Sequence, residues 1–148
     1  FRARATDDGC AWDDITDSVD VAHKQLRRMS RTWLGEIAPE IVPTLIEERL
    51  EAVMTDTLAI SGQPDILSLT TVRDIKSSYR GTWPQFQLGA YALILTAHGH
   101  DVTALLQDRV PRTPLKKPQP PAETTRMDVR AAMQDAHTVL RRIDADAA

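Results

Sequence analysis

The sequence predicts an α/β or α+β layered domain, in which helices flank a central mixed β-sheet. Two stretches, residues 18–34 and 127–143, repeat apolar side chains at helical spacing, and a third such stretch follows Pro84. Short runs rich in Val, Ile and Leu lie between them and have the composition of strands. The order helix, strands, helix, strand, helix is typical of a layered domain.

The chain has 148 residues, of which 42% are apolar and 26% charged, as expected for one globular domain. We expect this domain over residues 18–143, after a loose acidic segment (1–17) and before a frayed tail (144–148). No apolar run approaches the ~20 residues of a membrane helix, and the cytoplasm is the expected compartment. Because Cys10 is the only cysteine, disulfide frameworks and cysteine-ligated zinc or iron–sulfur sites within the chain are excluded. The chain opens on Phe1, so we expect that it can be part of a larger protein or complex.

The first helix is expected to begin after Thr16 or Ser18, either of which can cap it, and to run to about Leu34. Residues 44–54 fit a helix or a strand by periodicity. We favour a strand, because apolar pairs precede this stretch and a second strand follows it.

Residues 58–69 and 71–77 are predicted to form a β-hairpin. Gly62 and Pro64 interrupt the first of these strands, because proline cannot donate a ladder hydrogen bond and glycine favours irregular backbone. We therefore expect a bend or bulge between these two residues.

The second half of the chain is predicted to hold a helix, a strand, a loop and the closing helix. The helix opens at Pro84, runs to about His98 and stops at Gly99. A strand over residues 102–110 precedes an extended loop over 111–121, which holds five of the nine prolines. The expected buried face of the Pro84 helix is Phe86, Ala90, Leu93, Ile94 and Ala97.

The charge of the chain is unevenly distributed. The net charge of −3 alone does not favour general affinity for nucleic acid. Residues 109–142, however, carry eight basic and three acidic side chains, and we expect Arg112, Lys116 and Lys117 to contact the phosphates of DNA. The alternative is that this stretch is an ordinary solvated face.

Two acids and a lysine on the predicted hairpin form a candidate catalytic site. Side chains at i and i+2 of a strand share a face, so Asp74 and Lys76 project together while Ile75 points into the core. If Asp65 faces them from the neighbouring strand, two carboxylates and the Ile75 carbonyl offer the hard oxygen ligands that Mg²⁺ or Mn²⁺ prefers. Lys76 would position the attacking water or offset charge on the phosphate.

The helix after Pro84 adds Gln87 and Tyr91, which share a face because they are four residues apart. We expect both to line the catalytic pocket rather than close the core. Trp83 could stack on a base. Each feature alone also has an ordinary explanation: a surface strand pair for Asp-x-Lys, a turn for Gly-x-Pro-Asp, and edge-of-core positions for the glutamine and tyrosine.

Taken together, "SGQPDIL", "VRDIKSS" and "QFQLGAY" resemble the motifs of the PD-(D/E)XK nuclease superfamily, and within it the RecB-type and phage exonuclease-like branch. The resemblance covers roughly residues 44–98. It implies a restriction-endonuclease-like core and a Mg²⁺- or Mn²⁺-dependent deoxyribonuclease for exonucleolytic, repair or recombination processing. It also implies that Asp65 and Asp74 are metal ligands, that Lys76 is catalytic, and that Gln87 and Tyr91 shape the site or contact DNA.

The same family often adds an upstream acid or histidine. "LIEERL" resembles the strand that brings in a glutamate, and we prefer Glu47 to Glu48 as the catalytic or metal-binding acid. His23 matches less well, because Val19 stands where the family usually has glycine. A non-catalytic DNA-binding or assembly module that keeps the fold, and an enzyme acting on RNA, are the alternatives. The oligomeric state stays open.

Overall fold

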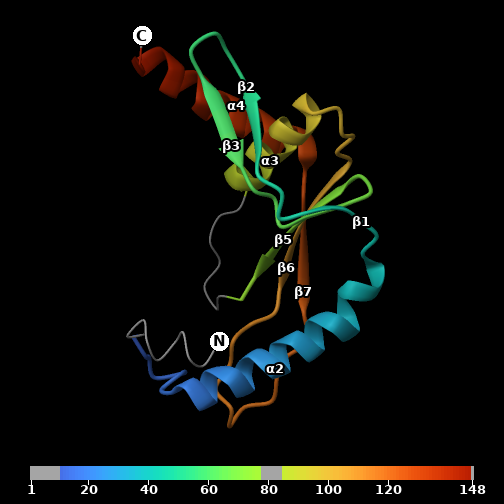
Figure 1. Cartoon of the computed structure of the whole chain (residues 1–148), viewed down its shortest axis with the longest axis vertical. Coiled ribbons are helices and arrows are strands. Elements are labelled where there is room, and N and C mark those ends of the chain that lie inside the picture. Colours follow the sequence, from blue (N-terminus) through green and yellow to red (C-terminus); the bar gives the residue numbers. More distant parts are fainter. Residues whose placement is uncertain (1–10, 78–84, 148) are drawn as a thin grey trace. The chain divides into compact units, whose positions relative to one another are not determined.

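The structure is a computed structural model that describes residues 11–77 and 85–147 (Figure 1). The described residues divide into two compact units, each assembled from three segments. The first unit comprises residues 11–40, 76–77 and 109–123, and the second comprises residues 41–75, 85–108 and 124–147. One domain over residues 18–143 stays a prediction, because a compact unit need not fold independently.

The central feature of the second unit is a five-stranded mixed sheet, with strand order β1-β4-β5-β6-β7. Its strands are β1 (Pro43–Ile46), β4 (Ile66–Ser68), β5 (Thr71–Lys76), β6 (Ala104–Arg109) and β7 (Glu123–Met127). β4 pairs antiparallel with both β1 and β5. β6 runs parallel to β5, since Thr103 N–H donates to the Thr70 carbonyl and Val110 N–H donates to the Lys76 carbonyl. The predicted fold class, a mixed sheet with helices, is confirmed.

The expected bend after Gly62 is a change of sheet. Strand β3 (Ala59–Gly62) pairs antiparallel with β2 (Leu50–Val53) in a separate two-stranded sheet, and only β4 continues into the hairpin with β5. The stretch predicted as one strand over 44–54 is likewise two strands, broken at Glu47, whose φ is +46°. The predicted hairpin is therefore confirmed only in its second half.

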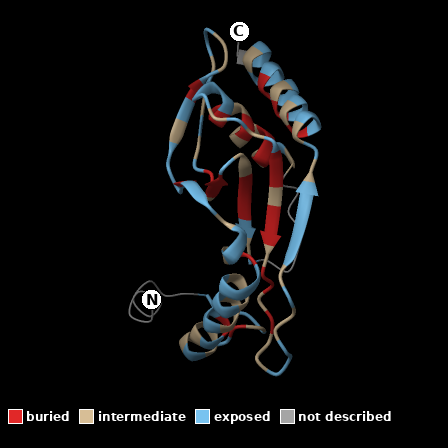
Figure 2. Ribbon diagram, turned by 90° about the vertical axis from the view of Figure 1, so that its right-hand side faces the viewer, coloured by how far each residue is buried: buried red, intermediate tan, exposed pale blue. Residues whose placement is uncertain are grey.

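Two helices of this unit, α3 (Gln85–Ala97) and α4 (Val129–Ala147), lie side by side (Figure 1). They share one apolar core with the sheet, and Figure 2 shows buried residues concentrated in the central strands. Residues 144–147, predicted as a frayed tail, are helical. Gly99 follows α3 with φ +83°, as predicted for a helix stop. The core residues are Leu45, Leu67, Val72, Leu88, Ala92, Leu95, Leu105 and Ala132.

α3 buries a different face from the predicted one. Its buried residues are Leu88, Gly89, Ala92, Ile94 and Leu95, so only Ile94 of the predicted face is buried. Phe86, which was expected in the core, is 42% exposed. A Cβ on Gly89 would lie 2.0 Å from the Ala132 carbonyl oxygen, so α4 covers the glycine side of α3. Helix α3 is thus covered by both the sheet and α4, and the Phe86 side is left outside.

The other face of the sheet holds a buried ion pair. The guanidinium of Arg73 lies 2.9 Å from the Asp108 carboxylate, and both side chains are almost fully buried. Thr124 Oγ1 donates to the same carboxylate from β7. This contact adds to the backbone pairing of β7 with β6; β7 is largely exposed and was not predicted as a strand.

The first unit is built around α2 (Val19–Glu36), which is followed by a short 3-10 helix (Ala38–Glu40). Ser18 caps α2 by accepting the Val21 N–H, which selects one of the two predicted caps. Gln25 is 2% exposed, accepts from Thr16 Oγ1 and donates to the Ile15 and Thr113 carbonyls.

These hydrogen bonds of Gln25 tie part of the predicted loose segment, and the proline-rich loop, to α2. The proline-rich stretch 111–121 contains no helix or strand, as predicted. Among the described helices, none is long and apolar enough to cross a membrane.

Candidate active site

Two neighbouring strands, β5 and β6, each carry a core residue followed by a polar residue on the same face. The apolar row consists of Leu67 on β4, Val72 on β5 and Leu105 on β6, each 0% exposed. Two residues farther along β5 and β6, alternation predicts a polar row. The polar row consists of Asp74 and Gln107, and Asp65 stands beside it in the bend before β4. The candidate site is therefore the polar continuation of the hydrophobic core.

Asp65 is fixed against β5 beside Asp74. The β4–β5 pairing ends with Ile66 opposite Arg73, and Asp65 stands in the bend that precedes β4. The Asp65 carboxylate accepts the Ile75 N–H at 2.7 Å, and its carbonyl accepts the Glu47 N–H at 3.0 Å. The hydrogen bond to Ile75 thus places the Asp65 carboxylate beside the residue that follows Asp74 in β5.

Asp74 is 1% exposed and accepts a hydrogen bond from Gln107 Nε2 at 3.3 Å. A buried carboxylate needs such donors, because burial without them is costly. Gln107 was not among the predicted site residues. The sequence did contain a signal for it. Gln107 stands two residues after Leu105 in a predicted strand, so an amide interrupts the apolar face of that strand.

The predicted orientation of β5 is wrong for Ile75. This side chain was expected in the core, but it is 36% exposed while its neighbour Asp74 is buried. Val72 supplies the core contact, and Asp74 shares its face. The site residues therefore lie on the core side of the strand.

Gln87 and Tyr91 share a face of α3, as predicted. Gln87 Nε2 donates to the Tyr91 hydroxyl at 3.0 Å. The tyrosine ring packs on Gly62, where an added Cβ would lie 2.8 Å from a ring carbon. With Gly62, Ile60, Phe86 and other residues they line a cavity of about 300 Å³.

The residues lining that cavity include neither Asp65 nor Asp74. Tyr91 also packs against the core. A catalytic or DNA-contacting role for Gln87 and Tyr91 therefore stays a prediction.

Lys76, Glu47 and His23 complete the predicted set. Lys76 ends β5, half-buried, two residues after Asp74. Glu47 is exposed in the link after β1, and His23 is half-buried on α2. Within residues 11–77 and 85–147, no three His, Cys, Asp or Glu side chains come together as a metal site. A role for Glu47 or His23 at the site stays a prediction.

Of the predicted DNA contacts, Arg112 has protein partners. It donates to the Asp13 carboxylate at 2.7 Å and to Thr16 Oγ1 at 2.8 Å. The Arg112 hydrogen bond, with those from backbone N–H groups, holds the pKa of the Asp13 carboxyl below its usual 3.8. Lys116 and Lys117 are exposed in the proline-rich loop, and Trp83 lies outside the described residues.

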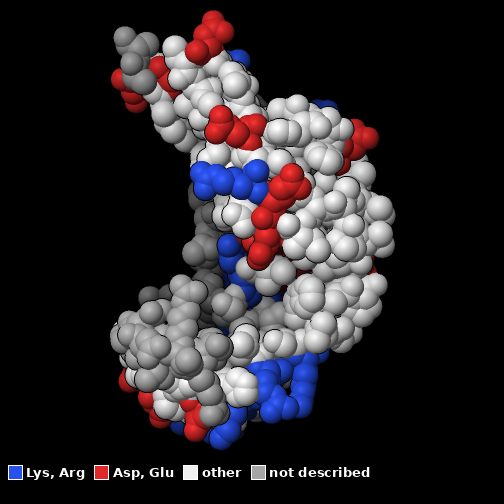
Figure 3. Space-filling model, viewed as in Figure 1, with Lys and Arg blue, Asp and Glu red and all other residues white. Residues whose placement is uncertain are grey.

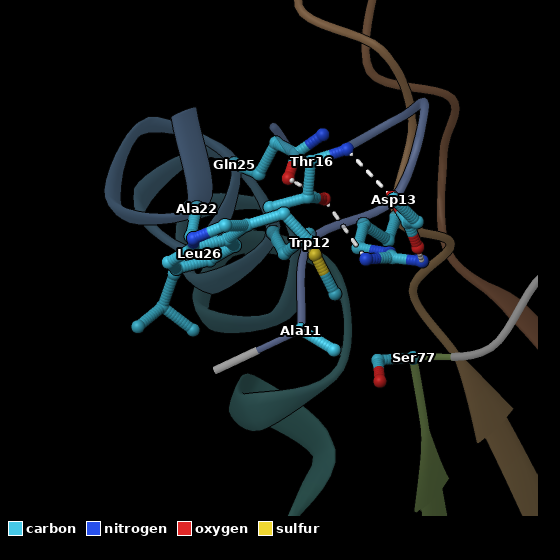
Figure 4. A pocket seen from close by; sticks show the side chains of 10 residues that line it. Ala11, Trp12, Asp13, Thr16, Ala22, Gln25, Leu26 and Ser77 are labelled. Atoms are coloured by element: carbon cyan, nitrogen blue, oxygen red, sulfur yellow. Dashed lines mark hydrogen bonds and ion pairs between the residues drawn. The ribbon is translucent and has the colours of Figure 1, made fainter. Parts of the chain in front are cut away.

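The first unit also holds a cavity of about 390 Å³ (Figure 4). Trp12 and Leu26 contribute apolar surface, and Asp13, Thr16 and Gln25 contribute polar groups that bond within the protein. The polar groups that line this cavity therefore serve to hold the local fold together.

By sequence, the chain matches no family model and no curated protein. By structure, it resembles the crystal structure of a protein from Eubacterium rectale named "Putative exonuclease", with a TM-score of 0.65 and 11% identity. The match covers 94% of this chain and 58% of that protein. The likeness shows a shared fold, and this chain spans little more than half of that protein's length.

Proposed function

We propose that this chain is a metal-dependent nuclease domain that hydrolyses phosphodiester bonds in DNA, in exonucleolytic, repair or recombination processing. The observation that carries the proposal is the hydrogen bond from the Ile75 N–H to the Asp65 carboxylate, which places Asp65 next to the buried Asp74, where the core of the sheet turns polar. The fold shared with the Eubacterium rectale protein and the three sequence motifs support the same reading.

The donor set suits Mg²⁺ or Mn²⁺. Asp65 and Asp74 would hold the ion, with the Ile75 carbonyl as a further oxygen ligand. Mg²⁺ in phosphate-processing sites commonly takes one or two carboxylates, and substrate phosphate and water complete its coordination. Two carboxylates without a third acid or histidine therefore fit. When bound, the ion would polarise the scissile phosphate and lower the pKa of a bound water.

The side chains of the chain would then supply orientation and charge. Gln107 holds the Asp74 carboxylate through its amide, which fixes the direction of one oxygen. Lys76 would offset the negative charge that builds on the phosphate as the bond to oxygen breaks. Gln87 and Tyr91 would shape the approach to the site through their mutual hydrogen bond.

The test is degradation of linear duplex, circular duplex and single-stranded DNA with Mg²⁺, Mn²⁺ or EDTA. Asp74→Asn should abolish degradation, because it removes one charge from the buried ligand. Asp101→Asn, an exposed position, is the matched control and should stay active. DNA binding without degradation in any metal would instead indicate a non-catalytic module. Full activity of Asp74→Asn would show that the Asp74 carboxylate takes no part in the reaction.

A further inference from the structure

Helix α2 carries a stripe of four cations. They lie at positions i, i+3, i+4 and i+7, which confines them to an arc of about 100° around the helix. With Leu115 they line a hollow of about 390 Å³ in the first unit, and Figure 3 shows Lys and Arg side chains gathered along α2. The four residues are Lys24, Arg27, Arg28 and Arg31.

Arg28 differs from the other three cations because its side chain hydrogen-bonds to the proline-rich loop. Its guanidinium donates to the Leu115 carbonyl at 3.3 Å and to the Lys117 carbonyl at 2.6 Å. It therefore clamps the proline-rich loop beside the stripe. The loop is held again where Ala122 N–H donates to the Glu36 carboxylate at 2.7 Å. The clamp brings two exposed lysines, Lys116 and Lys117, next to α2.

The remaining cations of the stripe have no ion-pair partner within the described part of the chain. Lys24, Arg27 and Arg31 are exposed, and none makes an ion pair or a side-chain hydrogen bond to another described residue. Like charges three or four residues apart destabilise a helix. Such a concentration of positive charge in a chain of net charge −3 indicates a surface for a polyanion.

We infer that Lys24, Arg27, Arg31, Lys116 and Lys117 form one binding surface for the phosphate backbone of a nucleic acid strand. The inference deepens the proposed function and rests on it for the identity of the polyanion. The stripe from Lys24 to Arg31 covers about 10.5 Å of helix axis. One DNA strand presents a phosphate about every 3.4 Å of its axis, so roughly three phosphates match this length. Lys and Arg contacts to phosphate carry no base information, and binding should be independent of sequence.

A lipid surface fits these observations less well. A helix that lies on a membrane buries apolar side chains between its flanking cations. The exposed leucines of α2 lie outside the arc of the stripe: Leu26 lies about 200° around the axis from Lys24, and Leu34 lies about 280° from it, beyond Arg27.

The experiment measures binding of a labelled duplex and a labelled single strand by fluorescence anisotropy across a salt series, in EDTA so that cleavage cannot interfere. The test variant is Lys24→Gln/Arg27→Gln/Arg31→Gln. The control is Arg130→Gln/Arg141→Gln/Arg142→Gln, which removes the same charge from exposed positions on α4. Circular dichroism confirms that both variants fold.

The slope of log K against log salt should fall by about 2.7 for duplex and about 2.1 for single strand in the α2 variant, if each cation meets one phosphate. The control slope should stay near wild type. An unchanged slope in the α2 variant, or an equal fall in the control, would overturn the inference. The inference would also be overturned if the α2 variant bound DNA as wild type does but lost binding to phosphatidylserine vesicles.

This result is separable from the proposed function. Cleavage by wild type with an unchanged α2 slope would reject only the phosphate surface. A reduced slope in a protein that degrades no DNA in any metal would reject only the nuclease.

Discussion

The hydrogen bond between Gln107 and Asp74 should contribute measurably to stability, and Gln107→Leu tests it. Leucine has a similar size, so the substitution removes the amide without opening a large cavity. Both side chains are at least 95% buried, since their exposures are 5% and 1%. Loss of a partner from a buried polar group costs about 1–3 kcal/mol. The 3.3 Å length favours the lower half of that range, about 1–2 kcal/mol.

For a chain of this size, such a loss corresponds to a fall in Tm of roughly 2–8 °C. Urea unfolding followed by circular dichroism gives the free energies of wild type, Gln107→Leu, Asp74→Asn and the double variant. The two residues touch, so the double variant should depart from additivity by at least about 0.5 kcal/mol. Additive effects would refute the claim that Gln107 holds Asp74.

Three further predictions concern other parts of the structure. Lys76→Ala should abolish DNA cleavage in a gel assay and leave DNA binding mostly intact; near wild-type turnover would exclude Lys76 from the reaction. Gly89→Ala should destabilise the protein by at least about 1–3 kcal/mol in urea unfolding, because the new Cβ would meet the Ala132 carbonyl at 2.0 Å; unchanged stability would contradict the close crossing of α3 and α4. The hydrogen bond with Arg112 lowers the pKa of Asp13 in the folded protein. The ionised Asp13 therefore stabilises the fold above pH 3.8, and this stabilisation is lost as the pH falls through the lowered pKa of the folded state. Asp13→Asn should therefore lower Tm at neutral pH and match wild type in strong acid, and a Tm difference that persists in acid would argue against this pair.

Local patterns in the sequence were enough to predict the helices and several of the strands around the site. Gly62 and Pro64 indicated an interruption of the strand, and the chain passes from one sheet to the other there. The spacing of Gln87 and Tyr91 predicted a shared helix face, which their hydrogen bond confirms. These features depend on a few adjacent residues, so sequence alone can show them.

Features that depend on tertiary packing were not predictable in the same way. The exposure of Ile75 and the burial of Asp74 follow from which face of β5 the helices cover, and alternation alone cannot decide this. Phe86 was misplaced because the approach of α4 at Gly89 selects the buried side of α3. Strand β7 was missed because its exposed, polar residues lack the apolar alternation of a strand.

The central claim is that Asp65 and Asp74 share one divalent cation, and calorimetric titration of Mn²⁺ into the DNA-free protein tests it most directly. Wild type should bind with a defined stoichiometry. Asp65→Asn and Asp74→Asn should each weaken this binding strongly, whereas Asp101→Asn should bind as wild type does. Equal Mn²⁺ affinity in wild type and in both site variants would contradict the account.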